Sequence, residues 1–300
     1  MPPTNLSPEQ RRTILRQRQS LPLEAKVRMS LKRIREWYEH WDGDVYVSFS
    51  GGKDSTVLLD LVRSVYPDVP AVFLDTGLEF PEIRDFVRST PNVTWIRPKM
   101  SFLEVIHKYG YPVVSKDVSQ KLYQIRNTRS DILRSKRMVG DAKGNGRMAA
   151  KWQSLIDAPF KISHLCCDAL KKRPAKLYER QTGAKPYVGT MTGDSTLRAT
   201  NYQRHGCNNF AGSRPMSAPM SFWTEVDVWQ YLREKQVPYC SIYDQGYERT
   251  GCMFCAFGAH LEKEPNRFQR MRMSHPKQWA YCMDNLGMRE VLATVGVKCE

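Results

Sequence analysis

The sequence predicts an α/β protein in which a mostly parallel sheet is flanked by helices. Three short runs rich in apolar, β-branched and aromatic residues have the composition of buried strands. The first begins at Val45 and enters the loop SGGKDS, after which Thr56–Val65 has the pattern of a helix. Pro70–Asp75 and Val93–Arg97 are the second and third runs, and Phe102–Tyr109 has helical spacing. Strands that alternate with helices indicate parallel pairing through crossover helices.

The elements around these strands also have recognisable patterns. Ser7 is placed to begin a first helix, and Leu23–Trp41 repeats apolar residues at helical spacing. Tyr187–Thr190 has the composition of a further strand, and Thr224 is a suitable N-cap for a later helix. Residues 116–161 are basic, and the turn DAKGNGR interrupts them. We expect two helices there, with an exposed hairpin between them.

Length and composition restrict the class of protein. A chain of 300 residues with 41% hydrophobic residues can form one large or two small domains around a substantial core. No run of 18 apolar residues occurs, so we expect no membrane span. The first residues contain no apolar stretch typical of a secretory signal, so we expect a cytoplasmic protein. Eight cysteines in such a chain indicate metal or redox chemistry and not a disulfide scaffold.

The charge and the pattern of elements predict a domain organisation. We expect an N-terminal helical segment at 1–41, a nucleotide-binding domain at 42–260 and a C-terminal helical tail at 261–300. A helical insertion near 116–161 interrupts the middle domain. The formal charge of +15 fits a polyanionic partner such as tRNA or DNA, for which this insertion is the best-placed surface. A solvated basic surface without a partner is the alternative.

The loop after the first strand has the composition of a phosphate-binding loop. Two glycines at a strand-to-helix turn allow main-chain N–H groups to face an anion, and the helix N-terminus adds a partial positive charge. Lys53 adds a full charge, and three serines add hydroxyl groups. The spacing differs from the common P-loop. The alternative is a simple turn that joins a strand to a helix. The expected contacts are Ser48, Ser50, Gly51, Gly52, Lys53, Asp54 and Ser55.

A second polar loop follows the second strand. Ligands of open α/β sheets bind beyond the carboxyl ends of the strands, so this loop is expected to border the same crevice. Asp75, Thr76 and Gly77 are its candidate contacts, although Asp75 also suits a turn or a helix cap. Pro81 and Glu82 are suitable residues for the start of the next helix.

Four cysteines form the second candidate site. Cys166 and Cys167 are adjacent, and Cys252 and Cys255 form a C-x-x-C motif. Adjacent thiolates chelate one tetrahedral zinc poorly, whereas an iron–sulfur cubane offers each thiolate a separate iron. The set therefore favours an iron–sulfur cluster, with zinc or a set of inert buried thiols as alternatives. Three other cysteines lie outside the pattern and are expected to be simple thiols: Cys207, Cys240 and Cys282.

Several of these motifs resemble those of known enzymes. SGGKDS resembles the loop of the PP-loop superfamily, whose members bind an adenine nucleotide in a Rossmann-like, adenine nucleotide alpha hydrolase-like sheet. DTGLEFPE and the run from VPY to DQGY resemble the phosphoadenosine-phosphosulfate (PAPS) reductase family. CCDALKKRP followed by GCMFC resembles the four-iron–four-sulfur motif of adenosine-phosphosulfate (APS) reductases.

The resemblance implies a 4Fe–4S cluster on the four cysteines and an adenine nucleotide, either ATP, APS or PAPS, on the phosphate loop. It also implies additional cations at the anion, from Lys171 or Lys172 and from Arg198. Ser195 and Arg198 match the end of a family loop, but Asp194 stands where Glu is usual and Met191 where Arg is common.

Three functions remain as alternatives. A sulfonucleotide reductase uses a C-terminal cysteine nucleophile and a thioredoxin-like electron donor, so Lys53 and Cys299 would be its catalytic residues. The tail here ends GVKCE and lacks the Gly-Leu-His of that family. An ATP-dependent sulfur-transfer enzyme acting on tRNA or DNA would account for the charge and the different tail. A nucleotide-sensing module without turnover is disfavoured by the intact Lys53 and the four cysteines.

Overall fold

The computed structural model describes residues 6–300, so the first five residues of the predicted N-terminal segment lie outside the described part. The chain divides into two compact units. The first comprises Met1–Asp75, Glu79–Arg97 and Ala175–Thr250, and the second comprises Thr76–Leu78, Pro98–Pro174 and Gly251–Glu300. The N-terminal helical segment therefore lies in the first unit. The insertion near 116–161 and the tail at 261–300 lie in the second.

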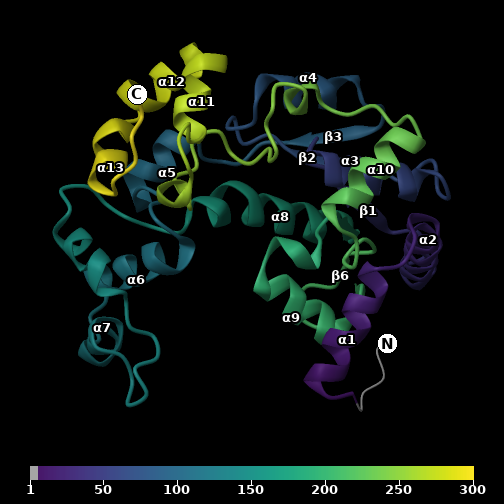
Figure 1. Ribbon diagram of the computed structural model, residues 1–300, viewed down its shortest axis with the longest axis horizontal. Coiled ribbons are helices and arrows are strands. Elements are labelled where there is room, and N and C mark those ends of the chain that lie inside the picture. The colour runs from purple at the N-terminus through teal and green to yellow at the C-terminus, as the bar shows by residue number, and fades with distance from the viewer. Residues whose placement is uncertain (1–5) are drawn as a thin grey trace. The chain divides into compact units, whose positions relative to one another are not determined.

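The first unit contains a six-stranded sheet in the order β3-β2-β1-β4-β6-β5 (Figure 1). Its strands are β1 (Val45–Ser48), β2 (Ala71–Leu74), β3 (Val93–Ile96), β4 (Lys185–Val188), β5 (Asn208–Asn209) and β6 (Met216–Ser217). Every pair is parallel except β5 with β6. This mostly parallel, Rossmann-like sheet with flanking helices confirms the predicted fold class.

Two strand predictions need correction. The fourth strand was predicted at Tyr187–Thr190 but begins at Lys185, because its pairing with β1 starts opposite Val45. Strands β5 and β6 were not predicted. Each has only two residues, which is too short for any periodic pattern.

Most helices of the first unit were predicted, but the helix that begins at Thr196 was not. They are α1 (Pro8–Gln19), α2 (Leu23–His40), α3 (Lys53–Arg63), α4 (Pro81–Ser89), α9 (Thr196–His205) and α10 (Glu225–Glu234), with 3₁₀ turns η3 (Thr192–Asp194) and η4 (Ser241–Tyr243). Ser7 and Thr224 cap α1 and α10 as expected. Helix α3 begins three residues before the predicted Thr56, because its first turn is the loop sequence Lys53-Asp54-Ser55 itself.

Both faces of the sheet are covered. On one face, the fully buried Trp37 of α2 packs near Tyr187, whose hydroxyl donates to the carbonyl oxygen of Ile34 over 2.7 Å. On the other face, Tyr46 and Val72 form a buried cluster. Burial on both sides explains why the first three residues of both β1 and β2 are apolar instead of alternating with polar residues.

The second unit is helical. It contains α5 (Phe102–Tyr109), α6 (Lys116–Asn127), α7 (Asp131–Met138), η1 (Ala150–Asp157), the π-helix η2 (Asp168–Lys172), η5 (Ala259–Leu261), α11 (Arg267–Ser274), α12 (Pro276–Ala280), η6 (Tyr281–Asn285) and α13 (Met288–Thr294). Helix α8 (Arg173–Thr182) begins in this unit and continues into the first. Of the helices within residues 6–300, none combines the length and apolar character needed to cross a bilayer.

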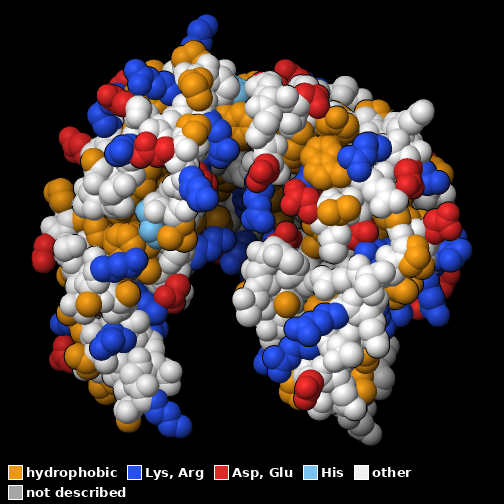
Figure 2. All heavy atoms as spheres, viewed as in Figure 1, with side chains coloured by type: hydrophobic (Ala, Val, Ile, Leu, Met, Phe, Trp, Pro, Cys, Tyr) orange, Lys and Arg blue, Asp and Glu red, His pale blue; other side chains and the backbone are white. Residues whose placement is uncertain are grey.

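The insertion differs from the prediction in one respect. Its two α-helices, α6 and α7, both precede the turn at 141–147, and a 3₁₀ helix, η1, follows it. The structure therefore does not place one α-helix on each side of the turn, as predicted. Helix α7 has no buried residue. Lys and Arg side chains lie over the surface of this segment (Figure 2).

Candidate functional site

The loop after β1 adopts a backbone that only glycine permits. Gly51 has φ of 71°, and a Cβ there would lie 2.9 Å from methyl groups of Ile83 and Val87 on α4. Gly52 is the N-cap of α3 and offers no capping side chain. The first turn of α3 therefore keeps its N-terminal N–H groups directed at the loop, as an anion site requires.

Two serines hold the loop together. The Ser55 hydroxyl accepts from the Ser50 N–H over 3.1 Å and donates to the Gly52 carbonyl oxygen over 2.9 Å. The two serine hydroxyls are 3.0 Å apart. Ser48 is the last residue of β1, so it sets where the loop begins. Gly189, just after β4, closes the loop from the side, because a Cβ there would lie 3.0 Å from the Asp54 carbonyl oxygen.

Lys53 places a buried positive charge in the loop. It is 5% exposed, and its Nζ lies 3.4 Å from Asp54 Oδ1 and 3.3 Å from Glu225 Oε1. Burial alone lowers the pKa of Lys53, but Asp54, Tyr243 and Glu225 outweigh it, so the pKa is raised. The side chain therefore remains an ammonium group at physiological pH. Glu225 had no predicted role, because it lies on a distant helix.

Tyr243, the last residue of η4, contacts the phosphate loop and was missed by sequence reasoning. Its hydroxyl accepts from the main-chain N–H of Lys53 over 2.8 Å and lies 3.0 Å from Thr250 Oγ1. The Lys53 ammonium lies 5.8 Å from the centre of the Tyr243 ring. Burial raises the pKa of Tyr243, so the hydroxyl is neutral. The only signal in the sequence was the family-like run around DQGY, which does not identify a contact with Lys53.

Asp75 is buried and ion-paired, whereas a side chain that contacts a ligand directly would be expected to be accessible. It is 3% exposed, and its Oδ2 accepts from Arg84 Nη2 over 3.0 Å and from Arg97 Nε over 3.3 Å. This carboxylate therefore orients two guanidinium groups at the carboxyl ends of β2 and β3. Thr76 accepts from the N–H of Leu78 over 3.3 Å. Nucleotide contacts from Asp75, Thr76 and Gly77 remain a prediction.

Ser195 and Arg198 lie at the start of α9. The Ser195 hydroxyl caps this helix by accepting from the Arg198 N–H over 3.3 Å. The Arg198 guanidinium is paired with Asp194. Asp194 is also close enough to contribute to the raised pKa of Asp54, for which burial is the main cause. Arg198 therefore belongs to the polar surroundings of the phosphate loop.

The structure brings the four predicted cysteines to one pocket in the second unit. The thiols of Cys166 and Cys167 are 4.0 Å apart, and none of the four cysteines forms a disulfide. About 320 Å³ in this pocket and in the open solvent at its mouth is not filled by protein atoms. Its walls are mostly apolar and include one ammonium group: Leu78, Phe102, Pro112, Cys166, Cys167, Leu170, Lys171, Cys252, Phe254 and Cys255. Within residues 6–300, no three His, Cys, Asp or Glu side chains form a group that could hold one metal ion.

Cations surround these thiols. The pKa of Cys167 is lowered by its hydrogen bond with Cys166 and by the ammonium groups of Lys116 and Lys171. The pKa of Cys166 is raised by the same hydrogen bond and by burial. Burial raises the pKa of Cys255, and Arg267 partly opposes this. Lys116 and Arg267 were not predicted, because only folding brings them to the cysteines.

Cys299 is buried in the C-terminal part of the second unit. It is 7% exposed, and burial raises the pKa of its thiol. The residues on either side are fixed to α11 or its N-cap: Asn266 Nδ2 donates to the Lys298 carbonyl oxygen over 2.7 Å, and Gln269 Nε2 donates to that of Glu300 over 2.8 Å. The thiol is therefore buried, and its raised pKa favours the protonated form.

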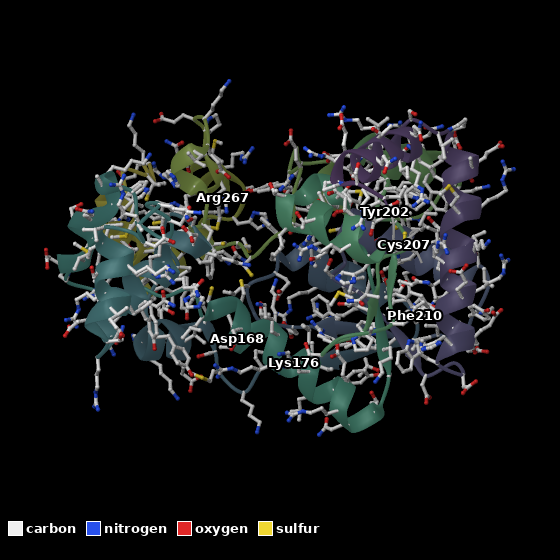
Figure 3. The ribbon with its side chains drawn as sticks, turned by 90° about the horizontal axis from the view of Figure 1, so that it is seen from below. Asp168, Lys176, Tyr202, Cys207, Phe210 and Arg267 are labelled. Carbon is white, nitrogen blue, oxygen red and sulfur yellow. The ribbon has the colours of Figure 1, made fainter. Side chains whose placement is uncertain are left out.

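The three remaining cysteines are also buried thiols. Cys207 lies in the first unit next to Tyr202 (Figure 3), and burial raises its pKa to about 12. Burial likewise raises the pKa of Cys240 to about 11 and that of Cys282 above its usual range. None of them lines the four-cysteine pocket.

Comparison with known proteins gives consistent matches. The family model of the phosphoadenosine phosphosulfate reductase domain matches residues 44–131 and 132–257. Adenosine 5'-phosphosulfate reductase of Staphylococcus epidermidis is 26% identical over 224 residues, which are 74% of each chain. An uncharacterized protein of Methanocaldococcus jannaschii is 27% identical over 252 residues, or 82% of this chain, but the match spans only 42% of that protein.

Among solved structures, PAPS reductase from Candida auris in a phosphate complex superposes with a TM-score of 0.44 at 20% identity. The superposition covers 82% of this chain and 96% of that chain. The matched family model includes both the phosphate loop and the four pocket cysteines. Because this family model matches residues 44–131 and 132–257, which are more than half of the chain, the chain belongs to the phosphoadenosine phosphosulfate reductase family.

Proposed function

We propose that this protein is a sulfonucleotide reductase that binds APS or PAPS at the loop of residues 50–55. The observation that carries the proposal is the buried Lys53 ammonium at the N-terminus of α3, next to two glycines. A fixed cation and the N–H groups of a helix N-terminus are what a phosphate or sulfate group needs for tight binding. Relatives named as APS reductases support this class of substrate.

We further propose a 4Fe–4S cluster on Cys166, Cys167, Cys252 and Cys255. The donor set fits, because four cysteines that form no disulfide line one apolar pocket, and the ammonium groups of Lys116 and Lys171 favour the thiolate of Cys167. When bound, the cluster would supply structural and electrostatic support to the site. Lys171, which lines this pocket, would add positive charge for a sulfate group.

The nucleophile is proposed to be Cys299. Its thiolate would attack the sulfate sulfur, the bond from sulfur to the bridging oxygen would break, and AMP or its 3'-phosphate would leave. A dithiol of the thioredoxin class would then reduce the enzyme-bound thiosulfonate and release sulfite. Because Cys299 is buried and its pKa is raised, the tail must leave Asn266 and Gln269 before the thiol reacts.

The decisive test is anaerobic purification followed by iron and sulfide analysis and parallel turnover assays with APS, PAPS and ATP. We expect about four irons per chain and sulfite release from APS or PAPS when a reduced thioredoxin is supplied. ATP hydrolysis to AMP and pyrophosphate without sulfite release would contradict the reductase proposal. In that case sulfur transfer to tRNA or DNA would become the function to test.

A further inference from the structure

The N-terminus of α3 has an acceptor from a distant segment. Gly52 has no side chain, so α3 has no cap from its own N-cap residue. The hydroxyl of Tyr243 accepts from the N–H of Lys53 instead, over 2.8 Å and from 190 positions further along the chain. A hydroxyl oxygen therefore lies where an oxygen of a bound phosphate or sulfate would accept from the same N–H group.

The Tyr243 hydroxyl is held firmly in this place. Thr250 Oγ1 lies 3.0 Å from it. The Tyr243 ring packs edge-on against Trp229, with ring centres 5.4 Å apart, and the residue is buried. A Cβ on Gly52 would lie 2.8 Å from Thr250 Oγ1 and 3.2 Å from Tyr243 Oη. The two hydroxyls thus form a pair against the glycine of the loop, and Gly52 is needed for them to approach.

We propose that Tyr243, supported by Thr250, competes with the anion for the Lys53 N–H and so sets the affinity and selectivity of the phosphate loop. The reason is the difference between the two acceptors. A neutral hydroxyl makes an ordinary hydrogen bond, whereas an anionic oxygen makes a charge-assisted one of roughly twice the strength. A phosphate or sulfate therefore displaces the hydroxyl, and an uncharged ligand does not. This inference rests on the proposed role of the loop as an anion site.

The test is isothermal titration calorimetry of the full chain with inorganic pyrophosphate. Tyr243→Phe keeps the ring against Trp229 and removes only the competing oxygen. We expect it to bind pyrophosphate about fivefold more tightly than the wild type, the equivalent of one neutral hydrogen bond. Tyr239→Phe is the matched control. Tyr239 packs against the same tryptophan, but its hydroxyl donates to Asp244 and not to the loop. The affinity of the Tyr239→Phe variant for pyrophosphate should therefore equal that of the wild type.

A second variant and a second measurement guard against a change in folding. Thr250→Val removes the partner hydroxyl at nearly constant volume and should tighten binding less than Tyr243→Phe. The amide resonance of Lys53 in the wild type should shift strongly when pyrophosphate is added, because its acceptor changes. Because Tyr243→Phe has no hydroxyl to displace, the change in this resonance should differ clearly between the variant and the wild type, whereas a merely structural tyrosine would give the same change in both.

The outcomes separate the two proposals. If the wild type binds pyrophosphate and Tyr243→Phe binds it equally or more weakly, competition is wrong and the anion site stands. If only Tyr243→Phe binds, competition is supported in its strongest form. If neither binds, the phosphate-loop proposal and this inference both fail.

Discussion

Arg267 donates a hydrogen bond from Nη1 to the main-chain carbonyl oxygen of Cys255 over 2.9 Å. Glu262 fixes the same guanidinium group, with Nε and Oε1 2.8 Å apart, and also accepts from the Arg267 N–H over 2.8 Å. This contact ties the second cysteine of the C-x-x-C motif to the start of α11, where Arg267 is visible in Figure 3. The loop that presents Cys255 is therefore positioned by a residue that lies twelve positions later.

Arg267→Ala is expected to weaken cluster retention. Losing a charged donor leaves the Cys255 carbonyl and the Glu262 carboxylate without this partner, at a cost of about 1–3 kcal/mol. We expect less iron per chain after anaerobic purification and faster bleaching in air. Arg272→Ala is the control, because Arg272 lies over Trp279 at 5.3 Å and does not contact the cysteines. Equal iron content in the two variants would show that the contact with Cys255 is dispensable.

Lys53→Ala is expected to abolish nucleotide turnover while the fold persists. The substitution removes the ammonium group at the anion, and it also leaves Asp54 and Glu225 without their cation. Pyrophosphate affinity should fall at least tenfold, because a charge-assisted contact is lost and two carboxylates repel the ligand. Calorimetry measures the affinity, and circular dichroism checks the fold. Unchanged affinity would remove Lys53 from the anion site.

Two cysteine variants distinguish the proposed ligands from buried thiols. Cys252→Ser should lose the brown, oxygen-sensitive chromophore, because a proposed ligand is lost. Cys282→Ser should keep it, because Cys282 is buried outside the four-cysteine pocket. The visible spectrum and the iron content measure both effects. Zinc without iron or sulfide in the anaerobically purified wild type would contradict the cluster.

Cys299→Ser tests the proposed nucleophile. A serine hydroxyl is a far weaker nucleophile than a thiolate, so the variant should bind nucleotide, retain the cluster and release no sulfite. Sulfite production by Cys299→Ser would exclude Cys299 as the nucleophile. If the enzyme is instead a nucleic-acid sulfurtransferase, the variant should stay active, and stimulation by tRNA or DNA should fade as salt rises.

The reactivity of Cys299 should depend on pH in a defined direction. Burial raises its pKa, so at a given pH a smaller fraction is thiolate than in an ordinary cysteine. Alkylation of Cys299 by iodoacetamide, followed by peptide mass spectrometry, should be slow at pH 8 and still increase above pH 9. Asn266→Ala should speed the reaction, because it removes the hydrogen bond to the Lys298 carbonyl. A rate that levels off below pH 8 would mean that the thiol is activated.

Much of the fold was predictable because its signals are local. The strands β1, β2 and β3 are continuous apolar runs, and helix α5 was predicted with its observed bounds, Phe102–Tyr109. The capping residues Ser7 and Thr224 were also identified, because a cap depends on residues within one turn. The phosphate loop was predictable for the same reason, since its residues are contiguous.

Local patterns in the sequence were enough to predict the fold class, the loop SGGKDS and the two cysteine pairs, because each depends on neighbours in the chain. The distant groups that complete these sites could be identified only in the folded chain. Tyr243 accepts from the Lys53 N–H, and Arg267 donates to the Cys255 carbonyl oxygen. No sequence motif indicates either contact. Folding also buried Cys299 and with it raised the pKa of the thiol. Which distant residues become hydrogen-bond partners depends on how the loops close and on which polar groups are buried, and both are properties of the whole folded chain.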